Sequence, residues 1–404
     1  MLSPTGSAHR LWIVALLSIV TGVAAGLPLC AAGEDVGSSL YAPGRFDGIT
    51  DVPGVRVAHV TKVEGTSVRT GATAIFPNAD PWNEKVAAAS ESYNGNGEMT
   101  GTHWVDEAGY LETPIVLTDT LDVGRADDGV ISWMMQRYPQ IGIGDDVPLP
   151  VVAECDDQLL NDIRGRYVGA QDVVALLDAA RTGQFARGSV GAGTGMRAFG
   201  FKAGIGSASR ILPKNLGGYT VGVLVNDNTG SSRALLTIDG VHVGRILRTE
   251  YLPIYPKRTG ALETRGKQGD GSIIVVVATD APLDHRQLHA LSKRVELGMG
   301  RVGLTSQIGS GDLFIAFSTA YAYTRDAEYN ILAPAARPIE DQDRLNALYG
   351  ATVEATEHAI YDALLSAKTM SGRGGVTFYG LPVQRVQMLL RAARSLENSG
   401  NDSR

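Results

Sequence analysis

Short apolar runs separated by Gly, Pro and Asp recur along the chain from about residue 45 onward. Such runs, about four to eight residues long and rich in β-branched side chains, are typical of buried strands. The most apolar run, SIIVVVA, begins at Ser272 and follows a polar, charged stretch over 255–271. We therefore predict an exposed loop that leads directly into a core strand. The other predicted strands cover residues 54–60, 72–76, 114–118, 149–153, 219–225, 235–243 and 309–318.

Three segments have the spacing of amphipathic helices. Residues 172–181 place their apolar side chains on one face and are followed by Gly183. Residues 282–300, with Asp284 as a candidate N-cap, and residues 344–367 are the other two.

Composition agrees with a large mixed α/β fold. The 404 residues are 44% hydrophobic, enough to bury the core of one large domain or two ordinary ones. The 49 glycines and 6% aromatic residues indicate many tight turns and close backbone approaches. The formal net charge is −7 without a Lys/Arg run, which argues against a nucleic-acid partner.

The first residues have the order of a secretory signal peptide. A weak basic region, His9 and Arg10, precedes an apolar stretch over 11–27, and small residues follow up to Gly33. We predict that residues 1–33 are removed and that the mature protein is periplasmic or secreted, with no stable membrane insertion. A single membrane anchor is the alternative. Removal would also take away Cys30, so that no intrachain disulfide is possible.

Several familiar chemistries do not fit. His285 and His289 have zinc-like spacing, but Arg286 stands where a metalloprotease needs Glu, so we expect a solvated helix face. The glycine-dense residues 188–206 lack the context of a nucleotide-binding loop, and we expect closely packed turns there. Cys155 is expected to be an ordinary buried cysteine.

The junction between Gly271 and Ser272 suggests a different chemistry. If the bond before Ser272 is cut, a free α-amine lies next to the serine hydroxyl. An α-amine has a pKa of about 7.7–8.0 and can act as the base that a weak serine nucleophile needs. An ordinary loop–strand boundary is the alternative that composition leaves open.

The junction segment GDGSIIVVVATDAPLDHRQL resembles the processing site of the DmpA family, which comprises L-aminopeptidase/D-esterases and β-peptidyl aminopeptidases. The resemblance covers most of the mature chain. It implies an αββα sandwich that cleaves itself into an α chain, 34–271, and a β chain, 272–404. The other matching segments are ITDVPGVRVAHVT, NGNGEMTGTHWVDEAG, PVVAECDDQLLND, VGAGTGMRAFGFKAGIGSASR, YTVGVLVNDNTG, GSGDLFIAFS and MSGRGGVTFYGLP.

The resemblance also implies site residues, with Ser272 as the nucleophile. Ser310 and Asp312, two apart on a predicted strand, share a face and would form a relay to the nucleophile or its amine. The family often has Glu at the position of Asp312. Asn228 matches an oxyanion-stabilising asparagine, and Glu154 matches a position that holds the free amine of the substrate. The alternative for Ser310, Asp312 and Asn228 is that they are turn residues, and the alternative for Glu154 is a structural carboxylate.

One position departs from the family pattern. By the resemblance, the L-aminopeptidase/D-esterase branch carries a tyrosine that assists the oxyanion two residues after the position of Glu154. This chain has Asp156 there. An ionised carboxylate does not stabilise an oxyanion. The departure favours the β-peptidyl aminopeptidase branch.

The sequence thus predicts a self-processing serine aminopeptidase that releases N-terminal residues, such as β-alanine, from small peptides or amides through an acyl-enzyme on Ser272. The resemblance implies no metal or organic cofactor, and it implies a homo-oligomer, a tetramer. Within the superfamily, the alternatives are an α-aminoacyl amidase/esterase or an acyltransferase. Outside it, the alternative is a non-catalytic periplasmic binding protein on the same scaffold.

Overall fold

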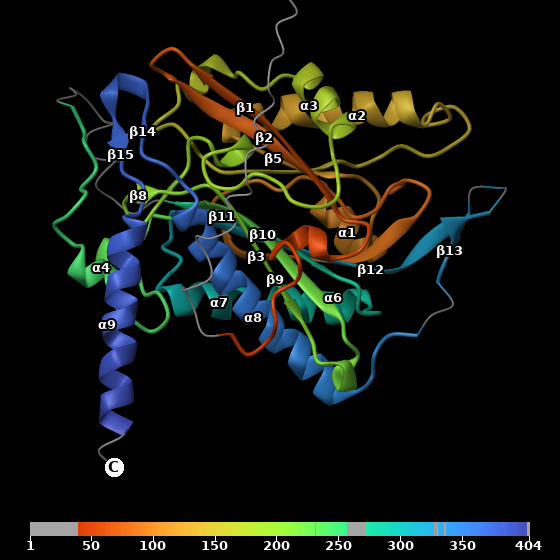
Figure 1. The fold of residues 1–404 in the computed structure, drawn as a ribbon. Helices are drawn as coiled ribbons and strands as arrows, with labels where there is room; N and C mark the ends of the chain where they lie inside the picture. Colours follow the sequence, from red (N-terminus) through yellow and green to blue (C-terminus); the bar gives the residue numbers. More distant parts are fainter. Residues whose placement is uncertain are drawn as a thin grey trace, which may run out of the picture. The chain divides into compact units, whose positions relative to one another are not determined.

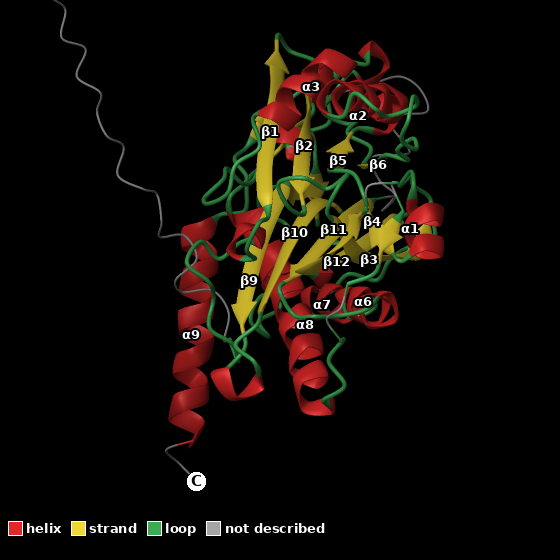
Figure 2. Cartoon of the chain, turned by 90° about the vertical axis from the view of Figure 1, so that its right-hand side faces the viewer, coloured by secondary structure: helices red, strands yellow, loops and turns green. Residues whose placement is uncertain are grey.

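Two β-sheets lie face to face, and helices cover the outer face of each (Figures 1 and 2). The smaller sheet has the strand order β1-β2-β5-β6, and the larger has the order β4-β3-β12-β11-β10-β9. Helices α2 and α3 lie on the smaller sheet, and α6, α7 and α8 lie on the larger one. This is the predicted αββα sandwich.

The bounds of these elements are as follows. The smaller sheet contains β1 (Arg56–Glu64), β2 (Val68–Phe76), β5 (Ile115–Thr118) and β6 (Val151–Glu154). The larger contains β3 (Lys85–Gly95), β4 (Tyr110–Leu111), β9 (Ile205–Ile211), β10 (Thr220–Asn228), β11 (Ser272–Thr279) and β12 (Gly311–Arg325), with β13 (Ile331–Leu332) paired to β12. The helices are α1 (Thr102–Ala108), α2 (Val123–Arg137), α3 (Ala170–Asp178), α4 (Val243–Ile246), α6 (His285–Ser292), α7 (Val295–Val302), α8 (Gln342–Leu365) and α9 (Val383–Asn401).

The computed structural model describes residues 39–256 and 271–401, except for 231, 327, 329, 335 and 336. These residues belong to one compact unit, Ala32–Arg404. The predicted signal peptide and most of the predicted loop before Gly271 lie outside the described residues. Within them, no helix combines the length and apolar character needed to cross a bilayer.

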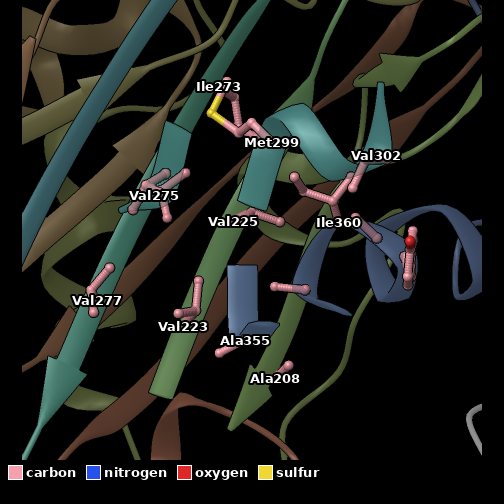
Figure 3. Packing of buried hydrophobic residues seen from close by; sticks show 14 of the residues in the cluster. Ala208, Val223, Val225, Ile273, Val275, Val277, Met299, Val302, Ala355 and Ile360 are labelled. Atoms are coloured by element: carbon pink, nitrogen blue, oxygen red, sulfur yellow. The ribbon is translucent and has the colours of Figure 1, made fainter. Parts of the chain in front are cut away.

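Strand β11 is the centre of the packing, because both of its faces are buried. Ile273, Val275 and Val277 face the helix layer, where they pack with residues of α7 and α8 (Figure 3). The alternate residues Ile274 and Val276 face the layer between the two sheets. The predicted core strand at Ser272 is confirmed.

The neighbours of β11 place three chain segments at one end of it. Strand β10 runs antiparallel to β11 and pairs Asn228 with Ser272. Strand β12 runs parallel and pairs Gly311 with Ser272. Parallel neighbours need a crossover, which α6 and α7 provide. The first residue of β11 therefore lies between the last residue of β10 and the first of β12.

Two of the predicted elements are corrected. Residues 235–243 form no strand but a short 3-10 turn, a single bridge between Ile238 and Val241, and the start of α4. Leu236, Ile238 and Val243 are buried in the core, and positive φ angles at Asp239 and Gly240 break the extended path. The predicted helix 282–300 is two helices, α6 and α7. The break lets α7 approach α8 closely at Gly298, where an added Cβ would lie 2.6 Å from Val353 O.

The contact between β9 and α8 yields a stability prediction. A Cβ at Gly206 would lie 2.0 Å from Ala359 O and 2.5 Å from Ala363 N of α8. Gly206→Ala should therefore force β9 and α8 apart and lower the free energy of unfolding by about 2–3 kcal/mol. Gly300→Ala in α7 is the control, since nothing lies within 4 Å of its added Cβ. Urea unfolding measures both, and equal midpoints would contradict this packing.

Candidate active site

Ser272, the first residue of β11, lines a cavity of about 370 Å³. Its side chain faces the layer between the sheets, on the same side of β11 as Ile274. The side-chain amide of Asn228 lies opposite, with Nδ2 donating to Ser272 Oγ at 3.3 Å. The cavity is lined by Asn96, Gly97, Glu98, Thr120, Glu154, Asp156, Gln158, Leu159, Arg197, Asn228, Gly271, Ser272 and Gly309.

Hydrogen bonds to both the oxygen and the nitrogen of its side-chain amide hold Asn228 in this orientation. Its Oδ1 accepts a hydrogen bond from the backbone N–H of Arg197 at 3.3 Å, and its Nδ2 also donates to Asp156 O at 2.9 Å. One amide hydrogen is thus used for Asp156 and the other points to Ser272. Asn228 is the last residue of β10 rather than a turn residue, so the strand pairing itself positions it.

Gly271 is enclosed by backbone. A Cβ at this position would lie 2.1 Å from Gly230 N and 2.7 Å from Asn228 O, so a side chain does not fit. The Gly271 carbonyl accepts a hydrogen bond from the backbone N–H of Gly311 at 3.2 Å. The bond between Gly271 and Ser272 is therefore fixed next to the serine hydroxyl, with its carbonyl already polarised by an N–H donor.

Glu154 supplies a buried carboxylate to the same cavity. It is the last residue of β6 and is 4% exposed. Its Oε1 accepts from Glu98 N at 3.1 Å, and Oε2 accepts from the Thr120 hydroxyl. Burial raises the pKa of Glu154; these hydrogen bonds oppose the shift, and the charges of Asp156 and Glu98 add to it. A substrate ammonium would neutralise this cluster of acids.

The carboxylate of Asp156 is hydrogen-bonded to Gln158, which also lines the cavity. The side chain accepts from the backbone N–H of Gln158 at 2.8 Å and from the Gln158 amide. The backbone carbonyl of Asp156, in contrast, holds Asn228. Asp156, which departs from the family pattern at this position, thus contributes to the site through its main chain.

Ser310 and Asp312 form the predicted pair, with Ser310 Oγ donating to Asp312 Oδ1 at 2.6 Å. Both are buried, and burial raises the pKa of Asp312, which the bond from Ser310 opposes. Asp312 lies opposite Ile273, however, so its side chain faces the helix layer and not the cavity of Ser272. The pair lines a second cavity of about 10 Å³, large enough for one water.

The glycine-dense residues 188–206 are closely packed turns, as predicted, but they also support the site. Lys202 is fully buried in them, and its Nζ donates to Gly193 O, Met196 O and Ala203 O at 3.2, 2.7 and 2.6 Å. Burial lowers the pKa of Lys202 to about 7, although three acceptors favour the three donors of the ammonium. This lysine fixes the turn that presents Arg197 to Asn228, a role that no sequence pattern indicated.

The structure describes the residues on which metal or cysteine chemistry would depend. Among the described residues, no group of three or more His, Cys, Asp or Glu is placed to hold a metal ion. His285 and His289 lie on a part-exposed face of α6, where they bond to Ala88 O at 2.8 Å and to Glu91 Oε2 at 2.7 Å, both on β3, and the His289 side chain is 41% exposed. Cys155 is buried, and burial raises the pKa of its thiol far above the usual range.

Comparison with known proteins identifies the family. Residues 47–378 match Peptidase family S58, and the chain belongs to this family of peptide hydrolases. It is 40% identical over 374 residues to the β-peptidyl aminopeptidase BapA of Sphingosinicella microcystinivorans, covering 88% of this chain and 90% of BapA.

Two solved structures are similar. A Burkholderia sp. β-aminopeptidase has a TM-score of 0.78 and 38% identity, over 88% of this chain and 97% of that one. The L-aminopeptidase D-Ala-esterase/amidase of Ochrobactrum anthropi, described as a variant of the Ntn hydrolase fold, has a TM-score of 0.77 and 36% identity, over 89% and 97%. The predicted family, fold and aminopeptidase activity are confirmed.

The raised pKa of Glu154 predicts how KM depends on pH. Because burial raises its pKa, the carboxylate should become protonated at a higher pH than an ordinary glutamate as the pH falls. The KM for an amide substrate with a free amine should therefore rise on the acid side. Glu154→Gln should raise KM at neutral pH by about 10-fold, from loss of a charge-assisted contact, and abolish that acid-side rise. An unchanged KM would assign Glu154 to structure alone.

Proposed function

We propose that this protein is a self-processing serine aminopeptidase that cleaves itself before Ser272 and uses the new N-terminal serine as its nucleophile. One observation carries the proposal. The Gly271–Ser272 bond lies at the end of a buried strand, with Asn228 donating to Ser272 Oγ and Gly311 donating to the Gly271 carbonyl. The bond from Gly311 belongs to the backbone ladder between β11 and β12, whereas the side-chain bond from Asn228 to the serine hydroxyl is not required by strand pairing.

Self-cleavage would begin with attack of Ser272 Oγ on the carbonyl carbon of Gly271. The C–O bond forms, the C–N bond to Ser272 breaks, and the proton of the hydroxyl ends on the nitrogen. The product is an ester between Gly271 and the serine oxygen, which water hydrolyses to a carboxylate and a free hydroxyl. The N–H of Gly311 stabilises the negative charge that develops on the Gly271 oxygen.

Peptidase turnover would repeat the attack on a substrate carbonyl. The α-amine of Ser272 takes the hydroxyl proton and returns it to the leaving amine, and water then hydrolyses the acyl-enzyme. Asn228 Nδ2, which lies 3.3 Å from Ser272 Oγ, supplies a donor for the oxyanion. In this proposal Glu154 holds the substrate ammonium, and the hydrogen-bonded pair of Ser310 and Asp312 orients the α-amine.

β-Amino acids such as β-alanine are the proposed N-terminal residues. Two relatives at 40% and 36% identity are β-peptidyl aminopeptidases, and Asp156 stands where the other branch has tyrosine. The second candidate is a D- or L-α-aminoacyl amidase/esterase, which the similarity to the Ochrobactrum anthropi enzyme favours. Relative rates on β-alanyl, L-alanyl and D-alanyl amides discriminate between them, and faster hydrolysis of D-alanyl amides would reject the first.

The remaining proposals concern the mature protein. We propose export after removal of residues 1–33, division into chains 34–271 and 272–404, and a tetrameric homo-oligomer in the periplasm or outside the cell. The order of basic, apolar and small residues at the start of the sequence supports export. Amino-terminal sequencing of the exported protein should begin near Gly33 or Glu34, and a retained apolar stretch would contradict this.

Replacing the nucleophile tests both of its roles. Ser272→Ala should give one uncleaved, folded and inactive chain, whereas wild type gives two fragments, the smaller of 133 residues. Ser272→Cys should cleave more slowly, since a thiol differs in size and pKa. Denaturing gels and hydrolysis of a β-alanyl amide measure these outcomes. Cleavage or activity in Ser272→Ala at the wild-type level would reject the proposal.

A further inference from the structure

The cavity at Ser272 contains charges of both signs. Three acidic residues line it: Glu98, Glu154 and Asp156. Glu154 is the last residue of β6, and Asp156 follows two residues later. Arg197 is the one cationic side chain among the described residues that line the cavity. The proposed mechanism uses the carboxylate of Glu154 to hold an ammonium and assigns no role to the guanidinium of Arg197.

Arg197 has a fixed place beside the nucleophile. Its backbone N–H donates to Asn228 Oδ1, and its Nη1 donates to Thr229 O at 3.0 Å, one residue further along. It lies on β7 (Arg197–Ala198), which pairs with β8 (Phe201–Lys202), and the buried Lys202 anchors this short hairpin. The guanidinium is therefore held at the Thr229 side of Ser272.

The opposite charges act on different parts of the site. Burial raises the pKa of Glu154, and the charges of Asp156 and Glu98 raise it further. Burial also raises the pKa of Tyr255, which the charge of Arg197 opposes. The guanidinium thus acts on the side of Thr229 and Tyr255, whereas the acids act on Glu154. A substrate in the cavity therefore meets negative and positive charge carried by different lining residues.

Given the proposed function, we propose that Arg197 binds the C-terminal carboxylate of the leaving residue, so that dipeptides with a free carboxylate are the preferred substrates. The substrate ammonium lies at Glu154, its carbonyl at Ser272, and the released residue extends toward Arg197. A guanidinium carries five N–H donors in a planar fork that matches a carboxylate, and it can bind protein and substrate oxygens together. A zwitterionic dipeptide complements the charges of both signs in the cavity.

The test compares two substrates that differ only at the carboxylate, β-alanyl-L-alanine and β-alanyl-L-alanine amide. Wild type should have a kcat/KM at least about 10-fold higher for the acid. Arg197→Gln keeps the backbone bond to Asn228 and should lower kcat/KM for the acid by about 10- to 100-fold, mainly through KM. The amide should change by less than about 3-fold, and Arg197→Lys should be intermediate, because it keeps the charge without the fork.

Each outcome decides the matter. Equal rates of wild type on the two substrates would overturn the carboxylate role without any variant, even if Arg197→Gln failed to process. An equal loss on acid and amide in Arg197→Gln would reduce Arg197 to a residue that positions Asn228. If wild type hydrolysed the amide but showed no preference, only this inference would fail. Hydrolysis of neither substrate would remove the proposed function and this inference with it.

Discussion

The pairing of three strands at Ser272 is the constraint on which the rest of the site depends. Asn228 at the end of β10 and Gly311 at the start of β12 are the direct partners of Ser272 at the start of β11. A shift of one residue in either pairing would turn Asn228 away from the hydroxyl, or Gly311 from the carbonyl before it. The register is strongly specified because alternate residues of β11 are buried in two different apolar layers.

The same pairing separates two environments across one strand. Ser272 Oγ, Asn228 and the carboxylate of Glu154 lie on the side between the sheets, in a cavity that admits substrate. Ser310 and Asp312 lie on the helix side, next to a cavity the size of one water. In the proposed mechanism, different groups would therefore serve the hydroxyl and the α-amine of Ser272.

Sequence patterns predicted those elements that are determined by the residues of a single chain segment. The core strand at Ser272 and the Asp284 N-cap follow from apolar runs and turn residues, and the resemblance supplied the sandwich and the site residues that lie together. The apolar pattern does not reveal strand β3, because polar residues occupy its second half, and it falsely indicates a strand over 235–243, because Leu236, Ile238 and Val243 are buried without an extended backbone. The buried ammonium of Lys202 and the main-chain role of Asp156 depend on tertiary contacts between distant segments, which periodicity does not encode.

The central claim is that the α-amine of Ser272, and therefore cleavage before it, is needed for peptidase activity. A time course on newly made wild-type protein tests this most directly, with the amount of the fragment starting Ser-Ile-Ile measured by mass spectrometry and the rate on a β-alanyl amide measured in parallel. The account predicts that activity rises in proportion to that fragment, from none in the uncleaved chain. Full activity in the uncleaved chain would contradict it, because no free amine would then exist at Ser272.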